Sequence, residues 1–248
     1  MVNAITAPRC EFGVIQPSTN TSVEAEFNWM LVPGVSWHSA RIWIPEPKMD
    51  SDKAFESVLE DVRASIEDAV KSVMSCQPDY LVMGMSVESF WGGKDGAEKF
   101  TAWMKELSGL DVTTGAAACE AALDAYKAKK IGVITPYQPV GDKQVFDFFT
   151  QMDYEVKAIH GLKCTTMTNI ADVTEDQMRD AFRKVNVPGT DALIQAGTNL
   201  ACAKVAAEME KELGKPVIAI NTATVWHSYR TNGIMDQISG FGSLLEEH

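Results

Sequence analysis

Short strand-like segments alternate with helical patterns along this chain, and the alternation leaves few folds open. Apolar runs at residues 80–86 and 192–197 are typical of strands buried on both faces of a sheet, and a further strand is expected at residues 40–45. Between the strands, apolar residues recur every three or four positions, as in segments 62–73 and 97–107, which is typical of amphipathic helices. This alternation predicts an α/β fold with parallel sheets and right-handed helical crossovers.

Two short patterns occur once in each half of the sequence. GVIQPST at residues 13–19 resembles GVITPYQ at residues 132–138, and LVMGMS at residues 81–86 resembles LIQAGTN at residues 193–199. The separation between the two patterns is nearly the same in each half. Patterns this short also arise by chance, but together they predict two related lobes that face each other.

We expect the lobes to comprise residues 1–114 with 223–248, and residues 115–222. Ligands in open parallel α/β sheets bind beyond the carboxyl ends of the strands. Four loops occupy that position in the two predicted lobes, so the sequence predicts a single cleft that all four loops line. The residues expected to bind a substrate there are Pro17, Ser18, Asn20, Gly84, Met85, Ser86, Tyr137, Gly197, Thr198 and Asn199.

The polar residues of these loops suit an anion. Hydroxyls, amides and free backbone N–H groups at the start of a helix stabilise negative charge without a cation. A simpler interpretation stays open for the first loop, in which Thr21 or Ser22 only caps the helix. Tyr137 is the best candidate proton donor, although its ordinary pKa of about 10 needs tuning. Glu24 is a spare acid or base near the cleft, but Glu24 and Glu26 are both expected to be solvated on the first helix.

Composition argues against several other function classes. The formal net charge is −12, which disfavours binding to nucleic acid, and no apolar run is long enough for a membrane partner. The five cysteines have no CxxC spacing, and the start of the chain has no signal-peptide pattern, so we expect reduced thiols in a cytoplasmic protein. No glycine-rich nucleotide motif occurs, and the four histidines lack metal-ligand spacing. We therefore expect neither a cofactor nor a metal.

Several motifs resemble those of a known group of enzymes. They are GVIQPSTNTSVEAE, LVMGMSVESFWGG, GVITPYQP, GTNL and GFGSLLEE, and they extend from about Phe12 to the C-terminus. Together they resemble the aspartate/glutamate racemase superfamily, and most closely its branch that contains maleate cis–trans isomerase and arylmalonate decarboxylase. The resemblance implies two pseudo-symmetric flavodoxin-like lobes, each a parallel sheet flanked by helices, with the active site in the cleft between them. It also implies a small carboxylate substrate and a homo-oligomer.

The resemblance fails at the reactive thiols. Members of this branch act through one or two cysteines at strand ends, and the corresponding residues here are Gly84 and Gly197. Cys202 lies five residues beyond Gly197 on a predicted helix, and Cys119 lies in an alanine-rich helix, so we expect both to be core residues. The two glycines are expected to leave room for a larger substrate or for an activated water.

We therefore expect an isomerase or a decarboxylase-like lyase that acts next to the carboxylate of a small organic acid. The reaction is expected to pass through an enolate-type intermediate without the cysteines of the family. Tyr137 and Glu24 are the expected catalytic residues. Two alternatives use the same cleft: a hydrolase or hydratase that activates water there, and a non-catalytic protein that binds small carboxylates.

Overall fold

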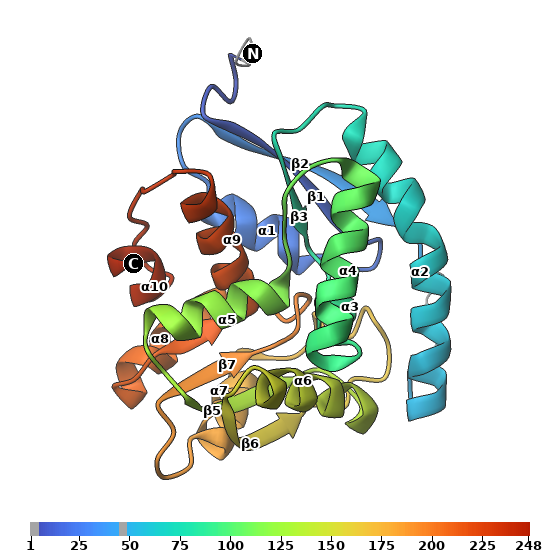
Figure 1. The fold of residues 1–248 in the computed structure, drawn as a ribbon. Helices are drawn as coiled ribbons and strands as arrows, with labels where there is room; N and C mark the ends of the chain where they lie inside the picture. Colours follow the sequence, from blue (N-terminus) through green and yellow to red (C-terminus); the bar gives the residue numbers. More distant parts are fainter. Residues whose placement is uncertain (1–4, 45–48) are drawn as a thin grey trace.

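The computed structural model describes residues 5–44 and 49–248, without the side chains of residues 58–61 and 64. Within this part of the chain, two four-stranded parallel sheets carry the fold, as Figure 1 shows. The first sheet has the order β2-β1-β3-β4 and the second has the order β6-β5-β7-β8. The strands are β1 (Cys10–Pro17), β2 (Val35–Ile42), β3 (Tyr80–Met83), β4 (Val112–Thr113), β5 (Lys130–Thr135), β6 (Glu155–Gly161), β7 (Ala192–Gln195) and β8 (Val217–Ala219). The expected α/β class, with a parallel sheet in each of two lobes, is confirmed.

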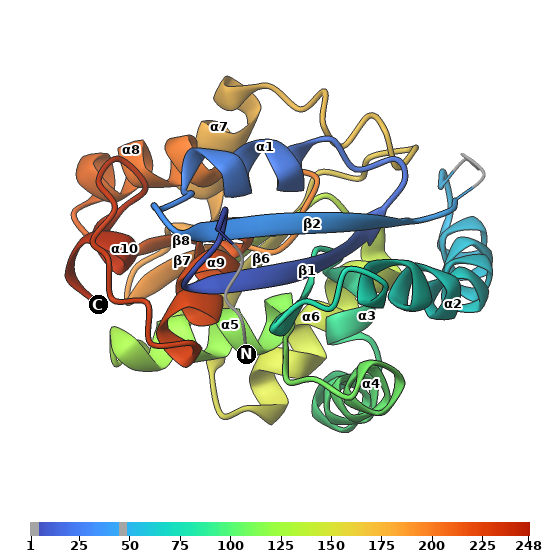
Figure 2. The same cartoon turned by 90° about the horizontal axis from the view of Figure 1, so that it is seen from above.

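Helices cover both faces of the first sheet (Figures 1 and 2). On one face, a Cβ atom at Gly13 of β1 would lie 3.0 Å from Val73 of α2. On the other face, the ring of Phe12 lies 5.9 Å from that of Tyr229 in α9, between ring centroids. The helices are α1 (Ser22–Trp29), α2 (Asp52–Met74), α3 (Val87–Phe90), α4 (Gly93–Ser108), α5 (Gly115–Ala125), α6 (Pro139–Gln151), α7 (Glu175–Val185), α8 (Ala203–Leu213), α9 (Ile220–Thr231) and α10 (Ser243–Glu247).

Local sequence signals explain where several elements begin and end. A capping box starts α7, because Thr174 and Gln177 exchange side-chain to backbone hydrogen bonds. Gly109 ends α4 in the left-handed region, at a φ of 71°. Strand β2 begins earlier than the expected residues 40–45, because it is an edge strand whose first half carries polar, partly exposed side chains. A strand of this kind has no continuous apolar run to reveal it.

The strand registers define how the two lobes correspond. Ile15 pairs with Met83 in the first sheet, and Ile134 pairs with Gln195 in the second. The residue that follows β3 or β7 then donates its backbone N–H to the isoleucine carbonyl of the neighbouring strand. Gly84 donates to Ile15 at 2.7 Å in the first lobe, and Ala196 donates to Ile134 at 2.9 Å in the second. Gly84 therefore corresponds to Ala196, and the counterpart of Gly197 is Met85. The pairing of Gly84 with Gly197 that the sequence suggested is wrong by one residue.

Two further findings complete the architecture. The C-terminal part of the chain returns to the first lobe, where the hydroxyl of Tyr229 in α9 donates to the carbonyl of Met30 at 3.0 Å. Among the described residues, no helix has both the length and the apolar composition required to cross a bilayer. The polar loops after β1, β3, β5 and β7 all converge on the region between the two sheets.

Candidate active site

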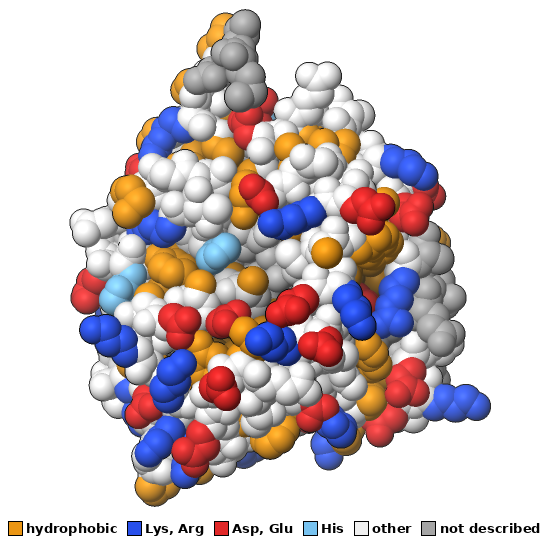
Figure 3. Space-filling view, viewed as in Figure 1, with side chains coloured by type: hydrophobic (Ala, Val, Ile, Leu, Met, Phe, Trp, Pro, Cys, Tyr) orange, Lys and Arg blue, Asp and Glu red, His pale blue; other side chains and the backbone are white. Residues whose placement is uncertain are grey.

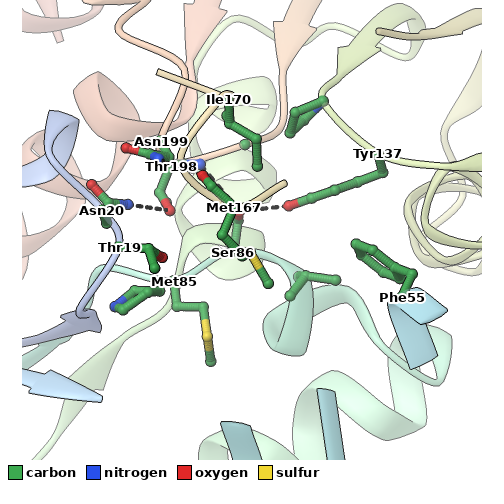
Figure 4. Close-up of a pocket in the computed structure, with 14 residues that line it drawn as sticks. Thr19, Asn20, Phe55, Met85, Ser86, Tyr137, Met167, Ile170, Thr198 and Asn199 are labelled. Carbon is green, nitrogen blue, oxygen red and sulfur yellow. Dashed lines mark hydrogen bonds between the residues drawn. The ribbon is translucent and has the colours of Figure 1, made fainter. Parts of the chain in front are cut away.

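A cavity of about 40 Å³ lies where these loops meet, and Figure 4 shows its lining. Residues of both lobes line it. They are Pro17, Thr19, Asn20, Phe55, Met85, Ser86, Val87, Pro136, Tyr137, Met167, Ile170, Gly197, Thr198 and Asn199.

The cavity brings together most of the residues predicted to bind a substrate, but three predicted site residues lie outside its lining. The hydroxyl of Ser18 accepts the backbone N–H of Ile44 at 3.0 Å and so is engaged elsewhere. Gly84 packs inward, since a Cβ atom there would lie 3.0 Å from a methyl group of Val23. Glu24 forms an ion pair with Arg41, and its side chain is 40 % exposed. The structure therefore gives Glu24 no contact with the cavity, contrary to its expected catalytic place.

Asn20 has a double function at the start of α1. Its side-chain oxygen accepts the backbone N–H groups of Ser22 and Val23, each at 3.0 Å. Asn20 therefore satisfies the first turn of the helix, and the hydroxyl of Thr21 makes no capping bond. The amide nitrogen of Asn20 donates to the hydroxyl of Thr198 at 3.3 Å, across the two lobes.

Ser86 connects the polar groups that line the cavity. Its hydroxyl lies 2.6 Å from the hydroxyl of Tyr137 and accepts the backbone N–H of Thr198 at 3.1 Å. Figure 4 shows Ser86 and Tyr137 approaching from different lobes. These three groups satisfy one another's hydrogen bonds. An incoming anion can replace the Ser86 oxygen as the acceptor for the other two groups, so the arrangement is a preformed set of hydrogen-bond donors.

Tyr137 is held as a neutral phenol. Burial raises its pKa far above the ordinary value of a tyrosine, more than the bond to Ser86 lowers it. Its backbone N–H donates to the hydroxyl of Thr135 at 3.1 Å, and Thr135 in turn donates to the carboxylate of Asp142. Burial also raises the pKa of Asp142, to about 6. A phenol that resists ionisation is suited to donate a hydrogen bond, and it is a poor source of protons for carbon.

Two carboxamides orient the second-lobe loop. Gln195 donates its side-chain N–H to the carbonyl of Gly197 at 2.6 Å, and Asn221 donates to the carbonyl of Thr198 at 2.9 Å. The C=O and N–H groups of a trans peptide point in opposite directions. The N–H groups of Thr198 and Asn199 are therefore both turned away from these anchors, and that of Thr198 points to Ser86. The loop presents two successive backbone donors of the kind that bind anions.

None of the residues that line the cavity carries a formal charge at neutral pH or a thiol. Cys119 and Cys202 are both fully buried outside the lining, and burial raises the pKa of each thiol. Cys202 immediately precedes α8, so the expected helix begins later than the sequence suggested. Within residues 5–44 and 49–248, no cluster of three or more acidic, histidine or cysteine side chains is arranged to bind a metal.

The two glycines do not leave free space, contrary to expectation. A Cβ atom at Gly197 would lie 2.4 Å from Cδ of Pro136, so the proline ring already occupies that volume. At Gly84 the neighbouring atoms belong to Val23, Gln16 and the carbonyl of Ile15. The space next to each glycine is therefore filled by the chain itself.

The charge distribution over the whole molecule does not favour an anion in the cavity. Acidic and basic side chains are interspersed on the face of the molecule in Figure 3. The formal net charge of −12 gives no long-range attraction for an anion. An anion bound in this cavity would therefore be held by the neutral donors that line it.

Several residues of the site could not be recognised from the sequence. Phe55 comes from α2, where it fits an apolar helical stripe, and Met167 and Ile170 come from a loop that has no pattern. Glu26 was expected to be solvated, but it is 1 % exposed and accepts the backbone N–H of Ala203 at 2.7 Å. The available signal was its helical spacing, because Glu26 falls on the buried face of α1 beside Phe27.

Comparison with known proteins identifies similar chains along almost the whole length. The family model described as arylmalonate decarboxylase matches residues 12–245. A maleate isomerase from Pseudomonas putida is 23% identical over 241 residues, covering 94% of this chain and 96% of that protein. The structure is similar to that of a maleate cis–trans isomerase variant from Nocardia farcinica with a covalently bound succinylcysteine intermediate. The TM-score is 0.86 at 21% identity, covering 96% of this chain and 98% of that one. It is also similar to a structure of arylmalonate decarboxylase, with a TM-score of 0.74 at 19% identity over 95% and 98% of the chains.

Proposed function

This chain belongs to the arylmalonate decarboxylase family, and on that premise we propose that it is a lyase that decarboxylates a small malonate-type acid without a thiol. The observation that carries the proposal is a cavity lined by neutral hydrogen-bond donors together with apolar side chains. The relatives are enzymes that are named for isomerisation or decarboxylation. Of these two reactions, decarboxylation makes the smaller demand on the residues present.

The hydrogen-bond donors of the lining suit the carboxylate that stays on the substrate. Ser86 and Tyr137 offer hydroxyls, and Thr198 and Asn199 offer backbone N–H groups. Donors that are already oriented stabilise charge that develops on carboxylate oxygens, typically by several kcal/mol in a water-poor site. The same four groups therefore hold the acid and stabilise the enediolate that follows.

The apolar part of the lining suits the carboxylate that leaves. Phe55, Met85, Met167 and Ile170 are the large apolar side chains that border the cavity. An anionic group loses its hydration against such a wall, whereas neutral CO₂ is tolerated. The carbon–carbon bond breaks, its electron pair stays on the α-carbon as an enediolate, and CO₂ departs. Water then supplies one proton to the α-carbon, so that the dianion and water give a monocarboxylate and bicarbonate.

Two of the alternatives, an isomerase and a hydrolase or hydratase, lack a group or a space that they need. The Nocardia farcinica isomerase structure holds a succinylcysteine intermediate, whereas no cysteine lines the cavity described here. The hydrolase or hydratase expected from the sequence needs free space for an activated water beside Gly84 and Gly197, and that space is filled. Binding of a carboxylate without turnover uses the same donors, so experiment must separate it from decarboxylation.

The test is turnover of malonate, methylmalonate and phenylmalonate in D₂O, followed by NMR. We expect CO₂ release and one deuterium at the α-carbon of the product. The narrow cavity predicts faster turnover of the two smaller acids than of phenylmalonate. Maleate is the control substrate, and its conversion to fumarate would support an isomerase instead. Tight binding of the malonates without turnover would identify a carboxylate-binding protein.

A further inference from the structure

Glu26 is a carboxylate buried between the two lobes that the proposed reaction does not use. It lies on α1 in the first lobe, but its partners belong to the other half of the chain. One carboxylate oxygen accepts the backbone N–H of Ala203 at 2.7 Å, and the other accepts the side-chain N–H of Asn221 at 2.6 Å. The backbone N–H of Cys202 also favours the charged form of Glu26.

These contacts supply a cap that α8 does not provide for itself. The N-cap residue of α8 is Cys202, whose side chain makes no capping bond. A helix start has unpaired N–H groups and favours a negative charge. Glu26 provides both the acceptor and the charge from another part of the fold. The start of α8, and the loop from Gly197 that leads into it, are thereby tied to α1.

Asn221 extends this tie to the donors of the cavity. The two hydrogens of its amide nitrogen point to Glu26 and to the carbonyl of Thr198, at 2.6 Å and 2.9 Å. Its side-chain oxygen is buried and has no partner within the described structure. If the amide group of Asn221 rotated by half a turn, its oxygen would face the carboxylate of Glu26 and the carbonyl of Thr198. Both of these groups repel an oxygen that has no proton to share. The charge on Glu26 thus fixes the orientation of Asn221, and Asn221 anchors the carbonyl of the peptide between Thr198 and Asn199. Asn199 itself is also held to the start of α1, by the backbone N–H of Thr21 and the hydroxyl of Ser22.

We propose that Glu26 is a positioning residue that aligns the backbone donors of Thr198 and Asn199 through Asn221 and the start of α8. The inference rests on the proposed function only in its claim that these donors hold the substrate carboxylate. Neutralisation of Glu26 removes the reason for Asn221 to keep its orientation, because a neutral carboxyl or carboxamide can donate to the oxygen of Asn221. The carbonyl of Thr198 then loses its anchor, and the donors lose their alignment.

The alignment depends on pH in the neutral range. Burial raises the pKa of Glu26 to about 7, more than its three hydrogen bonds lower it. Cys202, the N-cap residue of α8, is a titratable neighbour whose thiol stays neutral through burial, and Asn221 on α9 has no charge. Lys204 on α8 lies over the ring of Trp29 in α1. Arg41 on β2 pairs with Glu24. Donor alignment is therefore expected to increase as the pH rises through about 7.

The experiment compares Glu26→Gln with Glu208→Gln. Glu208 lies on α8, is exposed and pairs with Arg179, so the control removes the same charge from the helix that Glu26 caps. In the wild type, we expect kcat/KM for a malonate to rise through about pH 7. In Glu26→Gln we expect that rise to be absent and kcat/KM above pH 8 to fall by about 10–100-fold. Amide hydrogen exchange of residues 198–203 should be faster in Glu26→Gln alone.

The exchange measurement needs no activity, so it still tests Glu26 if no malonate is turned over and the proposed function fails. Equal exchange and equal pH profiles in the two variants would overturn the inference. If Glu26→Gln does not fold, Asn221→Ala tests the same connection. We expect that variant to accelerate exchange at residues 198–200, and unchanged exchange there would also overturn the inference.

Discussion

The loops after β3 and β7 occupy corresponding places in the two lobes, yet they contribute to the site by different means. The loop after β3 offers a side chain, the hydroxyl of Ser86. At the corresponding place after β7, Thr198 offers its backbone N–H. One residue earlier, the first lobe has the long side chain of Met85 and the second has Gly197. The same scaffold thus builds a donor from a side chain in one lobe and from the backbone in the other.

The pseudo-symmetry of the fold therefore does not make the cavity symmetric. Backbone donors require their carbonyls to be anchored elsewhere, and Gln195 and Asn221 meet that need in the second lobe. A hydroxyl donor requires only that its rotamer is fixed, and Ser86 gains this from Tyr137 and Thr198. Substitutions in the two loops can separate the side-chain donor of the first lobe from the backbone donors of the second.

The largest effect is expected from Ser86→Ala. The change removes the hydroxyl that contacts both Tyr137 and Thr198, so kcat/KM for a malonate should fall about 100-fold or more. Steady-state kinetics on folded protein measures this, with circular dichroism as the check on folding. A loss below about tenfold would mean that the first-lobe hydroxyl is not a main donor.

Gly197→Ala tests why the second lobe has no side chain beside its donors. The added methyl group collides with the ring of Pro136, so the free energy of unfolding should fall by about 1–3 kcal/mol. Urea denaturation measures the change. Repeating the substitution in a Pro136→Ala background is the control, since the cost should shrink once the ring is removed. An equal cost in both backgrounds would contradict the steric explanation.

Met85→Ala tests the counterpart position in the first lobe. Shortening this side chain widens the cavity. The ratio of kcat/KM for phenylmalonate to that for malonate should therefore rise about tenfold. Competition between the two acids in one reaction measures the ratio directly. An unchanged ratio would show that Phe55, Met167 or Ile170 sets the size limit instead.

The smallest effect is expected from Thr198→Val. The variant removes a hydroxyl that accepts one long bond from Asn20, but it keeps the backbone N–H. A single neutral hydrogen bond of this kind corresponds to a reduction in kcat/KM of about threefold. Measured beside Ser86→Ala, it compares hydroxyl loss at equivalent positions of the two lobes. A loss as large as that of Ser86→Ala would mean that both lobes use side chains.

The sequence alone predicted the sheets and most of the site, because buried parallel strands have continuous apolar runs and their carboxyl ends face the ligand. Side-chain direction in the loops could not be predicted in this way. Ser18 and Gly84 are next to cavity-lining residues in the sequence but do not line the cavity, because Ser18 bonds to Ile44 and Gly84 packs against Val23. Phe55 and Met167 reach the cavity from distant segments, and only tertiary packing brings them there.

Glu26 shows a different limit of the sequence analysis. A glutamate on a helix is ordinarily solvated, and nothing near it in sequence reveals that its partners are Ala203 and Asn221. Glu24, two residues earlier, is exposed and paired with Arg41. The helical face distinguishes the two glutamates, but the partners of Glu26 become visible only when the lobes are assembled.

The position of the Pro136 ring also restricts how this chain can change over generations. A cysteine placed at position 197 by a single mutation would meet that ring at its first side-chain atom. Such a substitution would cost less stability once residue 136 has become smaller or has moved. Sulfur chemistry at this loop is therefore favoured by two changes, of which the change at residue 136 comes first.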